Sequence, residues 1–91
     1  MNAQELVVRI DDMGCSHSAN VASIDTYRNG IAGSVEVMPV CAWFPEAVKM
    51  LRENPGLDVG VHLTLTSEWE NVKWRPLTHC PSLVDRDGNF Y

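Results

Sequence analysis

Three short apolar runs alternate with two amphipathic segments along the chain. The runs at residues 6–10, 34–38 and 57–65 are rich in β-branched side chains and bounded by turn residues, which is typical of buried strands. Segments 16–29 and 44–53 repeat apolar residues at helical spacing and end at asparagine, glycine or proline. The pattern therefore predicts the order strand, helix, strand, helix, strand.

This order predicts an α/β fold with a parallel sheet, because connections of this length favour right-handed crossovers. Three strands and two helices cover only part of a (β/α) barrel, which typically needs about 250 residues. We therefore expect the 91 residues to form the first βαβαβ part of such a barrel. Residues 1–66 would be its core and residues 67–91 a loop on the active-site side, so the chain is predicted to be an N-terminal fragment.

Composition and charge narrow the function classes. Hydrophobic residues make up 45% of the chain and charged residues 21%, which is ordinary for a globular domain. The net charge of −5 argues against nucleic acid as a partner. No apolar run approaches the roughly 20 residues of a membrane span and no leader is visible, so we expect no membrane partner and a cytoplasmic location. The cysteines form no CxxC pair and are predicted to be reduced thiols: Cys15, Cys41 and Cys80.

Candidate metal ligands follow two of the predicted strands. Asp11 and Asp12 end the first strand, and His62 lies toward the end of the third. Ligands bind at the carboxyl ends of parallel strands. We therefore expect the ends of the first and third strands to lie side by side, with Asp12 and His62 facing one cleft. A carboxylate and an imidazole suit zinc or magnesium, although a third ligand must come from elsewhere.

Each candidate also has an ordinary structural interpretation. Neighbouring strand residues point to opposite sides, so one aspartate can bind metal while the other transfers a proton. Alternatively, the pair is a helix cap beside a solvated carboxylate, and His62 is a hydrogen-bonded core histidine. His17 either decorates the first helix or contacts substrate near the pocket. The tryptophans either pack inside the protein or offer a ring to a sugar face: Trp43, Trp69 and Trp74.

The residues around these candidates resemble the YdjC-like carbohydrate deacetylases. Residues 9–14 with Ser16 and Asn20 are similar to the family's opening motif of two aspartates, glycine, serine and asparagine. Residues 58–66 are similar to its second motif, a glycine-containing strand that ends in His-Leu-x-Leu-Thr. Residues 74–90 resemble the loop that follows that strand. Taken in order, these motifs cover most of the chain.

The resemblance implies a (β/α)-barrel hydrolase that removes acetyl groups from N-acetylated sugars, chitooligosaccharides in the best-known branch. It implies Asp11 as the general base, and Asp12 and His62 as ligands of one divalent metal ion, magnesium or zinc. The family's third ligand is a later histidine, and His79 does not lie in a matching motif. Met13 and the turn after it depart from the common pattern, which leaves branch and substrate open.

The implied partner is an N-acetylated oligosaccharide. The third ligand and the general acid are expected beyond residue 91, so the chain alone is predicted to be inactive. Its open sheet edges predict a marginal fold or a homo-oligomer. Two alternatives from other classes remain. A non-catalytic carbohydrate-binding or interaction module would keep the fold without the chemistry. A phosphorelay receiver domain also binds magnesium at an acidic pair, but it needs an aspartate near the place of His62.

Overall fold

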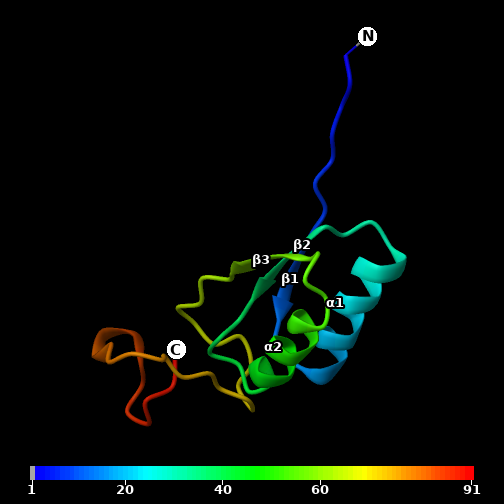
Figure 1. Cartoon of the computed structure of the whole chain (residues 1–91). Helices are drawn as coiled ribbons and strands as arrows, with labels where there is room; N and C mark the ends of the chain where they lie inside the picture. The colour runs from blue at the N-terminus through cyan, green and yellow to red at the C-terminus, as the bar shows by residue number, and fades with distance from the viewer. Residues whose placement is uncertain (1) are drawn as a thin grey trace.

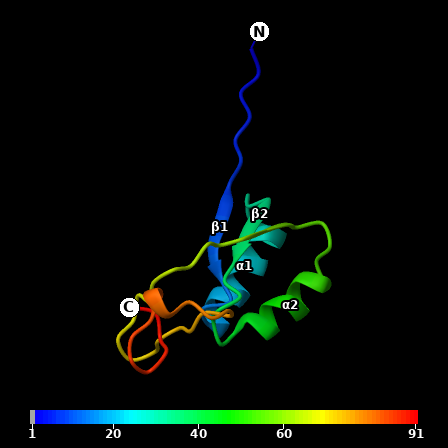
Figure 2. The same cartoon turned by 90° about the vertical axis from the view of Figure 1, so that its left-hand side faces the viewer.

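One three-stranded parallel sheet with two helices on one side forms the body of the protein (Figures 1 and 2). The structure is a computed structural model and describes residues 2–91. The elements follow the chain as β1 (Arg9–Met13), α1 (His17–Asn29), β2 (Ser34–Val37), α2 (Phe44–Arg52) and β3 (Asp58–Val61). This arrangement confirms the α/β class and the βαβαβ order. Closure into a barrel stays a prediction.

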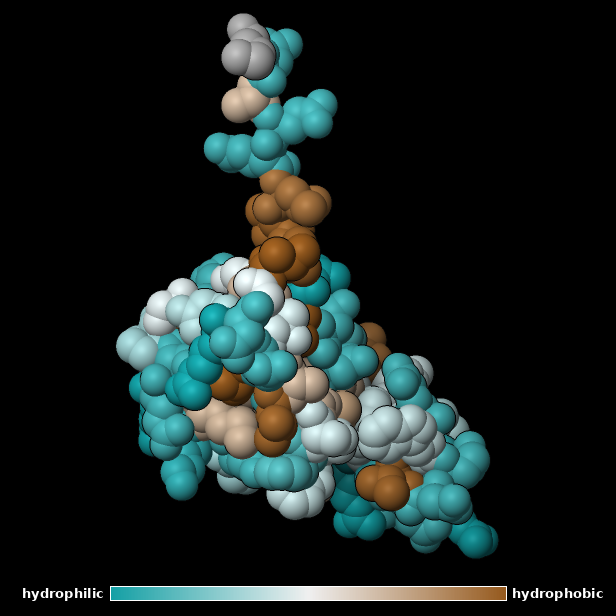
Figure 3. Space-filling model, turned by 90° about the vertical axis from the view of Figure 1, so that its right-hand side faces the viewer, coloured by the Kyte–Doolittle hydropathy of each residue, from teal (hydrophilic) through white to brown (hydrophobic). Residues whose placement is uncertain are grey.

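The strand positions correct the sequence-based boundaries. β1 begins three residues later than expected, because no strand among residues 2–91 pairs with Leu6 and Val7, which are 83% and 80% exposed in an extended arm (Figures 1 and 3). β3 ends at Val61 instead of continuing to residue 65. The expectation that the first and third strands lie side by side is wrong, because the sheet order is β1-β2-β3 and β2 separates them.

Local sequence explains where the helices begin. The Ser16 hydroxyl accepts a hydrogen bond from the Ala19 backbone N–H at 3.1 Å and thereby caps α1, as serine commonly does at this position. α2 begins at Phe44 with Pro45 in its first turn, where proline loses no helical hydrogen bond. Glu46 in the same turn lies near the positive end of the helix dipole.

The main core lies between the helices and the sheet. Its buried members come from all five elements or their ends: Met13, Ile24, Val35, Val37, Ala47 and Leu57. Helical cover does not reach β3, whose Val59 and Val61 side chains are 47% and 64% exposed. The core therefore stabilises β1 and β2 more than the outer strand.

The segment after β3 packs as a second, smaller cluster against the loop that follows β2. Its buried side chains are Met38, Cys41, Trp74 and Phe90. A short 3-10 helix spans Pro81–Leu83, and Gly88 adopts a φ of 81° in the turn that follows it. All three cysteines are free thiols, and burial raises the pKa of the Cys41 thiol to about 12. Within residues 2–91, no helix is long and apolar enough to cross a membrane.

Candidate active site

The carboxyl end of β1 carries a bulge at the paired aspartates. The pairing of β1 with β2 shifts register between Ile10 and Met13, and Asp12 has a φ of 67°. A left-handed backbone is rare for a residue with a side chain, although aspartate tolerates it better than most. Bulges often redirect a side chain near a functional site. Here the bulge sends the two neighbouring carboxylates to different partners.

Asp12 meets His62 across the end of the sheet. The Asp12 Oδ1 atom lies 3.3 Å from His62 Nε2. The His62 backbone N–H donates to the Val37 carbonyl at 2.8 Å, so the end of β2 fixes the position of this histidine. Although β2 separates the two strands, the expected convergence of Asp12 and His62 is present in the structure.

The proton arrangement of His62 leaves its outer nitrogen available. His62 Nδ1 lies 2.9 Å from the Leu63 carbonyl, which can only accept, so Nδ1 donates this hydrogen bond. In the neutral ring Nε2 is then an acceptor, and it faces the Asp12 carboxylate, which is also an acceptor. The contact is therefore stabilised by a proton on Nε2 or by a cation that both atoms bind.

The donor set fits a divalent metal ion. Tetrahedral zinc ligands at about 2.0–2.2 Å lie about 3.3–3.5 Å apart, which matches the separation of Asp12 Oδ1 and His62 Nε2. The Leu63 hydrogen bond on the other ring nitrogen is the usual support of a metal-binding histidine. Within residues 2–91, no three histidine, cysteine, aspartate or glutamate side chains group closely enough to hold an ion. The described residues therefore bring two candidate ligands together, Asp12 and His62.

Asp11 points to the open face of the sheet. Both of its oxygens contact the Arg9 guanidinium, at 3.0 Å from Nε and 3.3 Å from Nη2. Asp11, Arg9 and His62 line a cavity of about 240 Å³, together with Glu36 of β2. A proton acceptor at Asp11 would thus open toward the same cavity as the imidazole of His62.

Glu36 is a lining residue that was not predicted from the sequence. Its carboxylate lies across Gly60 of β3, where an added Cβ atom would lie 2.8 Å from Glu36 Cδ. Gly60 therefore leaves the room that this carboxylate occupies. Its position could have been predicted, because side chains alternate along Ser34–Val37 and this places Glu36 on the face opposite to the buried Val35.

A second cavity, of about 290 Å³, also borders His62 and is largely apolar. One wall is the chain from Val61 to Leu65, and the other comes from the C-terminal segment. Further lining residues belong to the loop after β2 or to that segment: Pro39, Val40, Pro76, Leu77, Thr78, Cys80, Leu83 and Phe90. His62 thus lines both cavities, together with its neighbours Val61 and Leu63.

His17 belongs to a network between the two helices. Its Nδ1 atom lies 2.7 Å from Glu46 Oε1, and its ring packs at 5.6 Å from the Trp43 ring. The hydrogen bond from Asn20, followed by the hydrogen bond and charge of His17, lowers the pKa of Glu46. A substrate contact for His17 stays a prediction, since one of its ring nitrogens is already used.

The two later tryptophans lie edge to face at 5.6 Å. Trp74 is 5% exposed and belongs to the second core cluster, whereas Trp69 is 42% exposed. Burial explains Trp74 as a packing residue, and Trp69 has the more accessible ring. Substrate contacts for both residues stay predictions.

Comparisons with known proteins agree on one family. A family model described as YdjC-like protein matches residues 5–91. A chitooligosaccharide deacetylase of Yersinia enterocolitica is 39% identical over 85 residues, which are 93% of this chain and 31% of that protein. A carbohydrate deacetylase of Clostridium beijerinckii is 37% identical over 86 residues, which are 93% of this chain and 33% of that protein. The chain thus spans about a third of the length of these relatives.

A solved structure shows the same arrangement. The crystal structure of a protein from Enterococcus faecalis, described as a cellobiose-phosphate cleavage protein, superposes with a TM-score of 0.82 at 31% sequence identity. The match covers 93% of this chain and 33% of that one. The backbone of the βαβαβ unit is therefore shared with a solved protein of about three times this length.

Proposed function

Because the chain belongs to the YdjC-like family, we propose that it is part of a metal-dependent hydrolase that removes N-acetyl groups from amino-sugar oligosaccharides. The contact between Asp12 and His62 carries the proposal, since a carboxylate oxygen and an imidazole nitrogen lie 3.3 Å apart, the spacing of two ligands of one ion. The names of the relatives support a carbohydrate substrate and deacetylation. We propose an N-acetylated oligosaccharide as the substrate and magnesium or zinc as the ion.

The proposal gives the three residues different tasks. Asp12 and His62 would hold the ion, which when bound polarises an amide carbonyl and acidifies water. Asp11 would accept the proton of the attacking water, as a base that opens to the 240 Å³ cavity beside His62. Arg9 holds the Asp11 carboxylate by two contacts and thereby restricts its orientation. The exposed ring of Trp69 is the more accessible candidate for a sugar contact.

Metal titration of the 91-residue chain tests these assignments. Two protein ligands are fewer than the three of a catalytic zinc site, so we expect weak binding, measurable by NMR at high metal concentration. Asp12→Asn and His62→Ala should abolish the changes in chemical shift that metal causes, whereas Asp11→Asn should retain them. Loss of binding in Asp11→Asn with retention in Asp12→Asn would reverse the assignments. Indifference of metal binding to all three changes would exclude a metal site here.

Acetate release from N-acetylglucosamine oligomers tests whether the chain contains enough of the site to act. We expect no release above buffer, because the chain covers a third of its relatives and supplies two ligands. Robust turnover would show that the described residues hold a complete site. Oligomer binding without metal binding would favour the non-catalytic carbohydrate-binding module.

The outer strand supports the proposal of self-association. In the part of the chain that the structure describes, β3 pairs with β2 alone, and Val61, Leu63 and Leu65 are 64%, 86% and 62% exposed. An exposed edge with apolar side chains is a template for pairing with another chain. Light scattering over a range of concentrations should show a rising mean mass, and a constant monomer mass would exclude association.

A further inference from the structure

Asn20 of α1 is a buried side chain whose hydrogen bonds join three parts of the chain. It is 0% exposed. Its Oδ1 accepts from the Gly14 backbone N–H at 2.7 Å, and its Nδ2 donates to the Trp43 carbonyl at 3.0 Å and to Glu46 Oε2 at 2.9 Å. A fully satisfied buried amide specifies one arrangement of the segments that it joins.

The orientation of this amide is determined by its surroundings. The Trp43 carbonyl and the Glu46 carboxylate both accept, so the NH₂ group of Asn20 must face them and the oxygen must face Gly14. His17 binds the other oxygen of Glu46 at 2.7 Å and holds that carboxylate in place. The side of Asn20 that faces Gly14 is therefore always an acceptor.

The turn that Asn20 holds is the one that leaves the aspartate bulge. Gly14 has a φ of 105° and follows Asp12, at 67°, by two residues. The Gly14 carbonyl accepts from the Trp43 N–H at 3.1 Å, and an added Cβ on Gly14 would lie 3.1 Å from the Met38 carbonyl. The turn is thus bound from α1 on one side and from the loop before α2 on the other.

We propose that Asn20 is the positioning residue for Asp12: its amide clamps the Gly14 turn and thereby keeps Asp12 in the left-handed conformation that directs its carboxylate to His62. Asp12 is an L-residue in a disfavoured region, so it relaxes toward extended backbone when the turn is released. That rotation moves the carboxylate away from the imidazole. The consequence for metal binding rests on the proposed function, but the consequence for the backbone does not.

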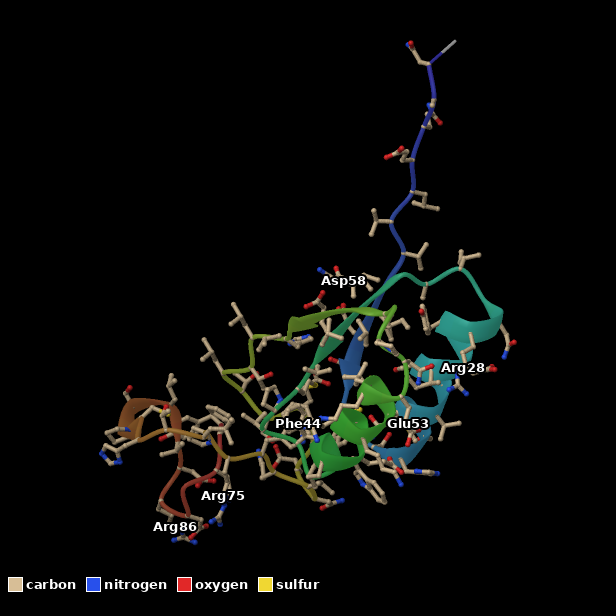
Figure 4. The ribbon with its side chains drawn as sticks, in the orientation of Figure 1. Arg28, Phe44, Glu53, Asp58, Arg75 and Arg86 are labelled. Atoms are coloured by element: carbon tan, nitrogen blue, oxygen red, sulfur yellow. The ribbon has the colours of Figure 1, made fainter. Side chains whose placement is uncertain are left out.

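The protein contains a matched control for this role. Asn54 is also buried, at 7% exposed, and also joins the two helices. Its Oδ1 accepts from Arg28 Nε at 2.8 Å and its Nδ2 donates to the Met50 carbonyl at 2.7 Å. Figure 4 shows Arg28 beside Glu53, the neighbour of Asn54, at the end of the helices away from Phe44. Asn54→Ala therefore removes a similar amide without touching the Gly14 turn.

NMR of the ¹⁵N-labelled 91-residue chain measures the backbone consequence directly. A residue with positive φ gives a strong NOE between its own amide and Hα protons. We expect this signal at Asp12 in the wild type and in Asn54→Ala, and its loss in Asn20→Ala while the remaining spectrum stays folded. A strong Asp12 signal in folded Asn20→Ala, or an equal loss in Asn54→Ala, would overturn the proposal.

A second pair of variants decides the case in which Asn20→Ala does not fold. Asn20→Asp keeps the acceptor for Gly14 but sets a carboxylate against Glu46, so the Asp12 signal should weaken. Adding Glu46→Gln restores a donor opposite that carboxylate and should recover the signal at least in part. Failure of the double variant to recover it would contradict the clamp.

Zinc titration then separates this proposal from the proposed function. Loss of a residue that orients a ligand typically lowers metal affinity by about 10- to 100-fold, so Asn20→Ala should bind zinc about tenfold more weakly than Asn54→Ala. If the wild type binds no zinc, the proposed function fails while the NOE result still decides the clamp. Equal zinc affinity in the two variants, with binding in the wild type, would overturn the role in positioning.

Discussion

The two faces of the sheet differ in what they are made of and in what they touch. On the covered face, Val35 and Val37 are 0% and 5% exposed and pack under the helices. On the open face, the charged side chains of Arg9, Asp11 and Glu36 line a cavity. Strand alternation therefore places the apolar side chains that stabilise the fold on one face of β1 and β2, and the candidate catalytic side chains on the other.

The bulge in β1 is where this division ends. Asp12 leaves the regular alternation at a φ of 67° and reaches His62, which follows the last residue of β3. The candidate metal pair therefore belongs to the edge of the sheet rather than to one of its faces. A regular strand would place Asp12 on the covered side with its neighbours Ile10 and Val35.

The largest effect on stability is expected when a charged residue replaces a valine on the covered face, compared with the reverse change on the open face. Val35→Glu sets an unpaired carboxylate in the core and should lower the free energy of unfolding by about 3–5 kcal/mol, as for other uncompensated buried charges. Glu36→Val places the same types on the open face and should stay within about 0.5 kcal/mol of the wild type. Urea unfolding followed by circular dichroism measures both.

The comparison of faces fails if the two exchanges have similar effects. Small domains have little stability to spare, so a loss of this size should shift the urea midpoint of Val35→Glu far below that of the wild type. A cooperative unfolding curve for Val35→Glu near the wild-type midpoint would show that the helices do not cover β2 as described.

A smaller effect is expected at the bulge itself, from the backbone rather than from packing. With metal removed, Asp12→Gly should be the most stable of three variants, Asp12→Asn intermediate and Asp12→Val least stable. The left-handed conformation costs residues with a Cβ about 1–2 kcal/mol, and β-branching makes it worse. Urea midpoints give the order, and equal stability of the Gly and Val variants would mean that positive φ is not required at Asp12.

The contact between Glu36 of β2 and Gly60 of β3 should have an effect on stability of about half that size. Gly60→Ala should stabilise the Glu36→Ala variant by about 0.4–1 kcal/mol, because alanine reduces the entropy of the unfolded chain. In the wild type the same change must displace the Glu36 carboxylate, whose Cδ would lie 2.8 Å from the new Cβ. The double-mutant cycle should therefore show coupling of about 0.5 kcal/mol or more. If Gly60→Ala changed the free energy of unfolding equally in both backgrounds, Glu36 and Gly60 would not interact.

Helix starts and the element order could be predicted because their causes are local. The Ser16 cap, the proline in the first turn of α2 and the spacing of the helical residues act within a few positions. Strand ends could not be predicted in this way, since a strand exists only where a neighbour pairs with it. Leu6 and Leu63 have strand-like sequence but lie outside the sheet, at 83% and 86% exposed.

The features of the candidate site also differ in whether they could be predicted from local sequence. Strand-end placement predicted that Asp12 and His62 converge, and alternation could have indicated Glu36 on the open face. Neither the bulge nor the Asn20 clamp follows from periodicity, because both depend on contacts between residues from β1, α1 and the loop before α2. Sequence pattern predicts which edge holds the candidate chemistry, and tertiary contacts decide how its side chains are directed.

The smallest expected effect concerns a charged group on the helix side of the sheet, Glu46. The hydrogen bond from Asn20, and then that of His17, lowers the pKa of the Glu46 carboxyl. A carboxyl with a lowered pKa in the folded state adds stability that is complete above its unfolded pKa, about 4.3, and is lost as the pH falls through the folded pKa. The urea midpoint of the wild type should therefore decline more steeply below that pH than the midpoint of Glu46→Gln. Asn20→Ala, which removes the first cause, should flatten the decline in the same way. Parallel pH curves for all three proteins would show that this carboxylate adds nothing to stability and that the helix side of the sheet relies on apolar packing alone.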